Sequence, residues 1–184
     1  MENKNTLKEI LDFVIYIAVV MAIAALLVTF VVQRTTVNGH SMEATLSDGD
    51  NLLMDKLSYR FKDPERFDII VFPYAGEENT HFIKRIIGLP GETVRIDYEG
   101  NIYINGEILD EDYGLETIVN PGIAVDEITL GEDEYFVLGD NRNNSKDSRF
   151  EDVGNIKRDD IIGKVFVRFY PFSDFGLVKN LGQD

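Results

Sequence analysis

The chain has 184 residues, 33 of them acidic and 18 basic, and a formal net charge of −15 at pH 7. This length allows one membrane anchor and one domain of about 150 residues, but not two soluble domains. The charge repels a phosphate backbone, so we expect no nucleic-acid partner. The chain has no cysteine, which excludes disulfides and thiolate catalysis, and its two histidines, His40 and His81, are too few for a typical zinc site.

The first predicted element is an uncharged apolar run over residues 13–32. As a helix it would span roughly 30 Å, the thickness of the bilayer hydrocarbon. A buried core helix is disfavoured because the run has no polar face, and a cleavable signal would have a shorter apolar core followed by a small-x-small site. Lys4 and Lys8 precede the run and Arg34 follows it. We therefore predict a single transmembrane helix, with residues 1–12 in the cytoplasm and residues 33–184 outside.

After Arg34, short β-rich runs alternate with turn residues. The expected strands are Asp68–Phe72, Thr93–Asp97, Ile102–Asn105, Glu134–Leu138 and Gly163–Tyr170. Pro90-Gly91 and Asn105-Gly106 are turn signals, since Gly and Asn accept a positive φ. The pattern predicts a mainly β fold, with an antiparallel domain over residues 33–184. The acidic, poorly periodic stretch Ile108–Ile128 is expected to be a surface excursion.

Three segments concentrate residues that can carry chemistry. The first runs from Asn38 to Leu46 and contains Ser41, with Gly39 two residues before it. A serine in such a turn can expose its hydroxyl while backbone N–H groups face a reacting carbonyl. In isolation, the same serine would more often cap a turn. The segment therefore needs a partner base to indicate catalysis.

The second segment places Lys84 among apolar residues, and on an alternating strand it shares a face with Phe82 and Ile86. Burial disfavours the charged amine, and a lysine pKa lowered to about 7 to 8 would make a usable base. The alternative is an edge-strand lysine that reaches water.

The third segment, from Gly139 to Arg149, is dense in hydrogen-bonding side chains. Asp147 with Arg149, and Asp140 with Arg85 of the second segment, are candidate ion pairs, and Ser145 is a candidate to orient an amine. The alternative is a solvated polar loop.

Together the three segments resemble the type I signal peptidases, membrane-anchored serine proteases with a Ser/Lys dyad. Ser41-Met42-Glu43-Ala44-Thr45-Leu46 is similar to the nucleophile motif of that family, Ser-Met-x-Pro-Thr-Leu. Lys84 to Gly91 resembles its lysine motif, and Gly139 to Arg149 its Gly-Asp-Asn-x-x-x-Ser-x-Asp-Ser-Arg loop. The chain departs from the pattern at Ala44, where the family usually has proline.

The resemblance implies that Ser41 is the nucleophile, Lys84 the general base and Ser145 the hydroxyl that orients the amine. Asp140, Arg85, Asp147 and Arg149 would be supporting charges. The oxyanion would be held by the Ser41 N–H and a second donor near Gly39, where some relatives carry serine. Pockets for small side chains would be lined by Val37, Met42, Leu46, Phe82 and Ile83, each of which could equally be core.

The implied substrate is an exported preprotein whose signal peptide lies in the bilayer and is cut after a small-x-small site. No cofactor and no metal are implied. Three alternatives stay open: a Ser/His hydrolase that uses His40 or His81, an inactive membrane-tethered interaction domain of the same fold, and a self-cleaving regulator. The regulators of this protease group carry a DNA-binding portion, whereas an apolar helix stands in its place here.

Overall fold

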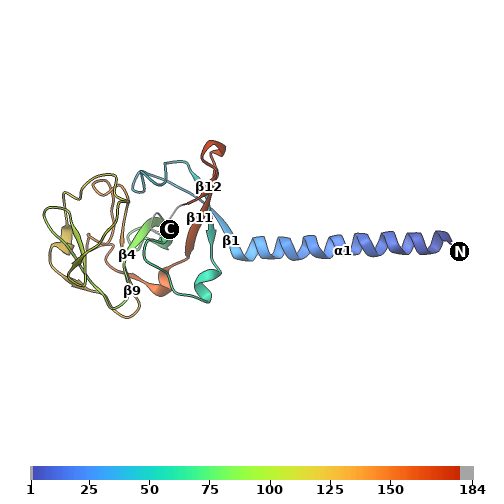
Figure 1. The fold of residues 1–184 in the computed structure, drawn as a ribbon, viewed down its shortest axis with the longest axis horizontal. Helices are drawn as coiled ribbons and strands as arrows, with labels where there is room; N and C mark the ends of the chain where they lie inside the picture. The colour runs from blue at the N-terminus through green and yellow to red at the C-terminus, as the bar shows by residue number, and fades with distance from the viewer. Residues whose placement is uncertain (1, 179–184) are drawn as a thin grey trace.

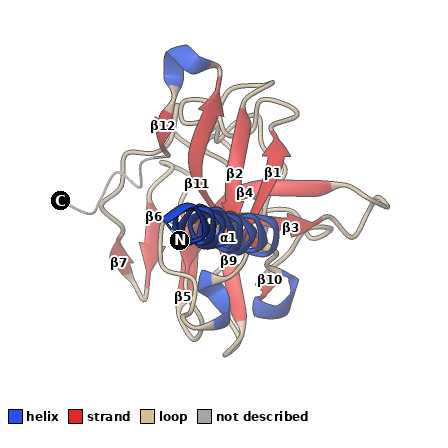
Figure 2. Cartoon of the chain, turned by 90° about the vertical axis from the view of Figure 1, so that its right-hand side faces the viewer, coloured by secondary structure: helices blue, strands red, loops and turns tan. Residues whose placement is uncertain are grey.

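The computed structural model describes the backbone of residues 2–178 and the side chains of residues 8–24 and 31–178. Figure 1 shows one long helix projecting from a β-domain, and Figure 2 looks along this helix onto the strands. The elements, in chain order, are α1 (Glu2–Val31), β1 (Val32–Thr36), β2 (Asn51–Asp55), η1 (Ser58–Arg60), β3 (Ile69–Pro73), β4 (His81–Gly88), β5 (Thr93–Ile96), β6 (Ile102–Ile104), β7 (Glu107–Ile108), η2 (Gly122–Val125), β8 (Ile128–Thr129), β9 (Glu134–Leu138), β10 (Ile156–Lys157), η3 (Arg158–Asp160), β11 (Gly163–Tyr170), η4 (Phe172–Asp174) and β12 (Gly176–Leu177).

The helix begins well before the predicted span and ends one residue earlier, because Val32 already belongs to β1. Its described apolar side chains are open to the surroundings; Phe13 is 65% exposed and Met21 66%. The side chains of residues 25–30, which belong to the predicted span, lie outside the described residues. Within the described part, no helix combines the length and apolarity needed to cross a bilayer.

The strands form two antiparallel sheets in the described part of the chain. The larger sheet has the order β1-β2-β11-β3-β4-β9-β10, with β12 beside β11, and the smaller has the order β7-β6-β5-β8. The predicted antiparallel β-domain is confirmed. Two of the predicted strands have the expected bounds, two end one residue earlier than predicted, and Asp68–Phe72 is shifted by one residue to Ile69–Pro73. The hairpin signal is also confirmed, because Asn105 and Gly106 both have a positive φ between β6 and β7.

The prediction of a surface excursion over Ile108–Ile128 is wrong in part. Tyr113, Ile118 and Ala124 within it are only 4%, 3% and 0% exposed. Ile118 and Ala124 pack into the cluster between the smaller sheet and the end of β9. Isolated apolar residues in an irregular segment cover this core without a repeating pattern, so periodicity did not reveal them.

Candidate active site

Ser41 and Lys84 meet although they come from different parts of the fold. Ser41 lies in the connection between β1 and β2, and Lys84 lies in the middle of β4. The Lys84 Nζ is 2.8 Å from the Ser41 Oγ and also donates to the Ile83 carbonyl at 3.0 Å. This is the hydrogen-bonding distance that a nucleophile and its base require.

The surroundings of Lys84 favour its neutral form. The residue is 3% exposed, and its Nζ lies 4.7 Å from the centre of the Phe82 ring. Burial lowers the pKa of Lys84 from 10.5 to about 8, while the negative charges of Asp147 and Asp140 act in the opposite direction. A lysine with this pKa can accept a proton at neutral to alkaline pH.

The loop after β9 is held close against the nucleophile segment. A Cβ at Gly139 would lie 2.2 Å from the Ser145 Oγ and 2.4 Å from the Ser41 carbonyl oxygen, so only glycine permits this approach. The Asn141 N–H donates to the Ser41 carbonyl at 3.0 Å, and its side-chain amide donates to the His40 carbonyl at 3.1 Å. Asn141 thus holds the backbone of Ser41 and His40 in place, a role that the sequence analysis did not assign to it.

Both predicted ion pairs are formed in the interior. The Arg85 Nη2 is 2.7 Å from Asp140 Oδ2, and neither side chain is exposed. The Arg149 Nε is 2.8 Å from Asp147 Oδ1, with side-chain exposures of 2% and 0%. Buried charges persist when they are paired and hydrogen-bonded, as here.

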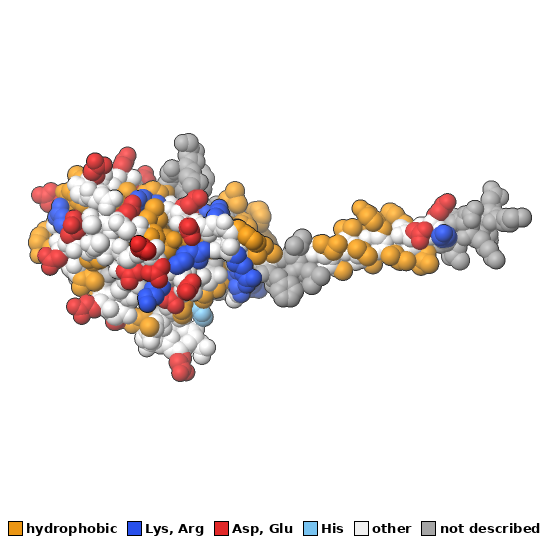
Figure 3. All heavy atoms as spheres, turned by 90° about the horizontal axis from the view of Figure 1, so that it is seen from below, with side chains coloured by type: hydrophobic (Ala, Val, Ile, Leu, Met, Phe, Trp, Pro, Cys, Tyr) orange, Lys and Arg blue, Asp and Glu red, His pale blue; other side chains and the backbone are white. Residues whose placement is uncertain are grey.

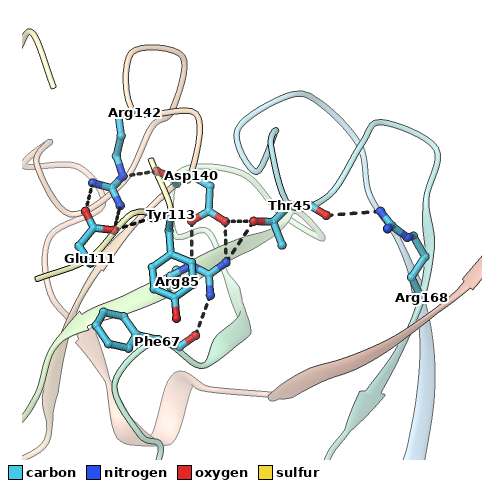
Figure 4. Close-up of polar contacts among 9 residues, drawn as sticks. Thr45, Phe67, Arg85, Glu111, Tyr113, Asp140, Arg142 and Arg168 are labelled. Atoms are coloured by element: carbon cyan, nitrogen blue, oxygen red, sulfur yellow. Dashed lines mark hydrogen bonds and ion pairs between the residues drawn. The ribbon is translucent and has the colours of Figure 1, made fainter. Parts of the chain in front are cut away.

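Figure 4 shows that the Arg85–Asp140 pair belongs to a longer network. Thr45 connects it to the nucleophile segment, because its hydroxyl donates to Asp140 Oδ2 at 2.5 Å and accepts from Arg85 Nη2 at 3.2 Å. From the other side, Arg168 of β11 donates to the Thr45 carbonyl at 3.3 Å and to Asp50 at 2.9 Å. Sequence reasoning gave no role to Thr45, Asp50 or Arg168. Only Thr45 had a signal, as a member of the serine motif.

The two remaining predicted polar roles fit the geometry less well. The Ser145 Oγ is buried and has no hydrogen-bond partner among the described residues, so the expected bond to Lys84 is not formed. The second oxyanion donor was expected near Gly39, but the Gly39 N–H already donates a hydrogen bond to Asp48 Oδ1 at 2.7 Å. Gly39 has a φ of +101°, a conformation that favours glycine. The Ser41 N–H, in contrast, has no partner in the described part and is free for an oxyanion.

A cleft of about 710 Å³ opens beside the dyad. Four of the five predicted pocket residues line it together with Ser41 and Lys84: Val37, Met42, Phe82 and Ile83. Leu46 is not among the lining residues; it is 1% exposed and packs in the core with Leu52 and Met54. The core alternative therefore describes Leu46 better than the pocket role.

Both histidines line the cleft, but neither is hydrogen-bonded to Ser41. The His40 Nδ1 lies 2.7 Å from Glu43 Oε1, a contact that raises the pKa of the imidazole. His81 begins β4 and is exposed. The described contacts thus give Ser41 a lysine partner rather than an imidazole.

Comparisons with known proteins agree with the resemblance in the sequence. A family model described as "Signal peptidase, peptidase S26" matches residues 10–170. A "Probable signal peptidase I-2" from Synechocystis sp. is 43% identical over 168 residues, which cover 89% of this chain and 73% of that protein. Signal peptidase IB of Staphylococcus aureus is 35% identical over 186 residues, covering 91% of this chain and 93% of that protein. A crystal structure of signal peptidase I from Enterococcus faecalis is 38% identical and covers 56% of this chain and 97% of that chain, with a TM-score of 0.45.

Proposed function

The chain belongs to the signal peptidase family, peptidase S26, and as a type I signal peptidase it removes signal peptides from preproteins; we propose that Ser41 is its nucleophile and Lys84 its general base. The 2.8 Å contact between Lys84 Nζ and Ser41 Oγ carries this proposal. It joins the nucleophile to an amine that burial keeps largely deprotonated above about pH 8.

The reaction follows from these two groups. Neutral Lys84 accepts the hydroxyl proton of Ser41 as the oxygen adds to the scissile carbonyl. When the tetrahedral intermediate collapses, Lys84 gives this proton to the leaving amine, and the signal peptide stays as an ester on Ser41. A water then attacks the ester while Lys84 takes one of its protons. As the bond between the acyl carbon and Ser41 Oγ breaks, Lys84 returns this proton to Oγ, so the signal peptide leaves with a free carboxylate and the Ser41 hydroxyl is restored.

Other polar groups support the dyad. The free N–H of Ser41 is the proposed oxyanion donor, since backbone N–H groups stabilise the charge that develops on the carbonyl oxygen. The pair Arg85–Asp140 links β4, which carries Lys84, to the loop after β9, and the pair Arg149–Asp147 lies within that loop. Ser145 is retained as a proposed positioning residue for the amine, because its buried hydroxyl has no partner among the described residues and is available to Lys84.

The cleft supports a preference for small side chains before the cut. Val37, Met42, Phe82 and Ile83 give it an apolar lining next to Ser41. An apolar pocket of limited size rejects large and charged side chains. We propose cleavage after a small-x-small site. The variant Ile83→Phe should reduce the space in the cleft and so restrict the side chains accepted before the cut more strongly to small ones.

A membrane location is part of the proposal. The sequence of residues 13–32 carries no charge, and the described apolar side chains of α1 have no protein covering them. Lipid is the solvent in which such a helix is stable. We propose a single span over residues 13–32, with residues 1–12 cytoplasmic and the catalytic domain outside, close to a signal peptide in the same bilayer. The charge of −15 argues against nucleic acid as a partner.

The test is cleavage of a purified preprotein in detergent by the wild type, Ser41→Ala and Lys84→Ala. The wild type should cut after a small-x-small site, and both variants should be inactive while retaining a cooperative thermal transition. Full activity of folded Lys84→Ala would place the base elsewhere, and an inert wild type would favour the interaction domain.

A further inference from the structure

The catalytic cleft is basic although the protein is strongly acidic. Its 17 described lining residues include Arg34, Lys84 and Lys146 but no Asp or Glu. At the average composition of the chain, about three of them would be acidic. Figure 3 shows Lys and Arg side chains gathered where the domain meets the helix, whereas its far end carries mainly acidic ones. A negative group in the cleft therefore meets less repulsion than it would meet on the acidic parts of the surface.

Most of the cleft cations are already compensated. Lys146 forms an ion pair with Asp152 and donates to the Tyr74 hydroxyl at 2.6 Å. His40 is paired with Glu43, and Lys84 must be neutral when it acts as a base. Lys146 and His40 thus have carboxylates of the protein beside them.

Arg34 differs because its partners are neutral. Its Nε and Nη2 donate to the Asn51 Oδ1 at 3.1 and 2.5 Å, and its guanidinium carbon lies 5.4 Å from the centre of the Phe169 ring. Three of its five N–H donors have no partner among the described residues. Asn51 and Phe169 hold the guanidinium in place without neutralising it, and a planar fork of this kind suits a carboxylate.

We propose that Arg34 is a specificity-determining residue that binds a carboxylate of the preprotein, so that an Asp or Glu flanking the cut favours cleavage. The inference rests on the proposed function. Arg34 does not touch the reacting atoms, so the contact should lower KM more than it raises kcat. For a solvent-exposed pair, the expected preference is about two- to five-fold in kcat/KM at low salt and smaller at high salt.

The experiment compares one preprotein with Asp and with Asn at each flanking position in turn, with the small-x-small residues kept. The enzymes are the wild type, Arg34→Gln, Arg34→Lys and the control Arg60→Gln, all in neutral detergent and all checked by thermal unfolding. Gln can still donate to Asn51, and Arg60 is exposed in η1 outside the cleft. We expect a preference for Asp at one or more positions that Arg34→Gln abolishes, Arg34→Lys partly keeps and Arg60→Gln leaves unchanged.

Equal cleavage of the Asp and Asn substrates by the wild type would refute the inference and leave the proposed function intact, whereas no cleavage of either would refute the function itself. A preference that survives in Arg34→Gln would also refute the inference. Repeating the assay in vesicles with and without anionic lipid covers one further outcome. If Arg34→Gln slows every substrate equally and only with anionic lipid, then Arg34 binds lipid phosphate and the inference is wrong.

Discussion

The pH dependence of cleavage should follow the titration of one buried lysine. Burial lowers the pKa of Lys84 from 10.5 to about 8, which means that the site disfavours the charged amine by about 3 kcal/mol. About a tenth of the protein then carries the neutral amine at pH 7, and half carries it at pH 8. We therefore expect kcat/KM to rise about tenfold per pH unit well below pH 8 and to level off above it.

The assay is kcat/KM for one preprotein from about pH 6 to about pH 10 at constant ionic strength. Thermodynamic linkage gives a second readout. The unfolded chain keeps the lysine proton up to about pH 10.5 but the folded protein releases it near pH 8, so the unfolded state binds more protons in this window. The contribution of Lys84 to stability should accordingly rise with pH between these values. A rate that inflects near the ordinary pKa of histidine, about 6.5, or a flat profile would refute this reasoning.

Three other predictions concern stability. Lys84→Met should abolish cleavage but raise the free energy of unfolding at pH 7 by about 1 to 3 kcal/mol, because it removes the buried charge. A lower free energy of unfolding than that of the wild type, measured by urea unfolding, would contradict this prediction. Asp147→Asn should lower the free energy of unfolding by about 3 kcal/mol, because it breaks the buried pair with Arg149. It should also move the inflection of the pH–rate profile to lower pH, since Asp147 raises the pKa of Lys84. The control is Asp152→Asn in the exposed pair with Lys146, which should change stability by less than about 1 kcal/mol. Ala44→Pro should stabilise by about 0.4 to 1 kcal/mol, because Ala44 has no backbone donor bond to lose among the described contacts; a lower melting temperature would show that the turn does not accept proline.

Local patterns predicted much of this fold. Alternation and turn residues located β3, β5, β6, β9 and β11 but not β1 and β2, because a strand with one buried face imposes a period of two on its own sequence. The buried residues of Ile108–Ile128 were not predicted, because each is fixed by contacts with strands that are distant in the sequence. Tyr113, for example, lies under the Arg85 guanidinium, 3.7 Å from its carbon to the ring centre.

The site residues that belong to sequence motifs were predictable, whereas those whose role depends on tertiary contacts were not. Ser41 and Lys84 came from motif order, and their contact follows from the way the β1–β2 connection reaches β4. Arg168 had no signal, because its role depends on how β11 pairs with β2 and brings the guanidinium to Thr45 and Asp50. The hydrogen bond from the Gly39 N–H to Asp48 could not be predicted either, since the fold of the loop brings these two residues together.

The most direct test of the dyad is a double-mutant cycle in cleavage rate with Ser41→Ala, Lys84→Met and the double variant. Residues that act as one unit are strongly non-additive, since losing either removes the same step. We predict that the double variant is no slower than either single variant. Losses that multiply in the double variant would show that Ser41 and Lys84 act in separate steps and would contradict the Ser/Lys mechanism.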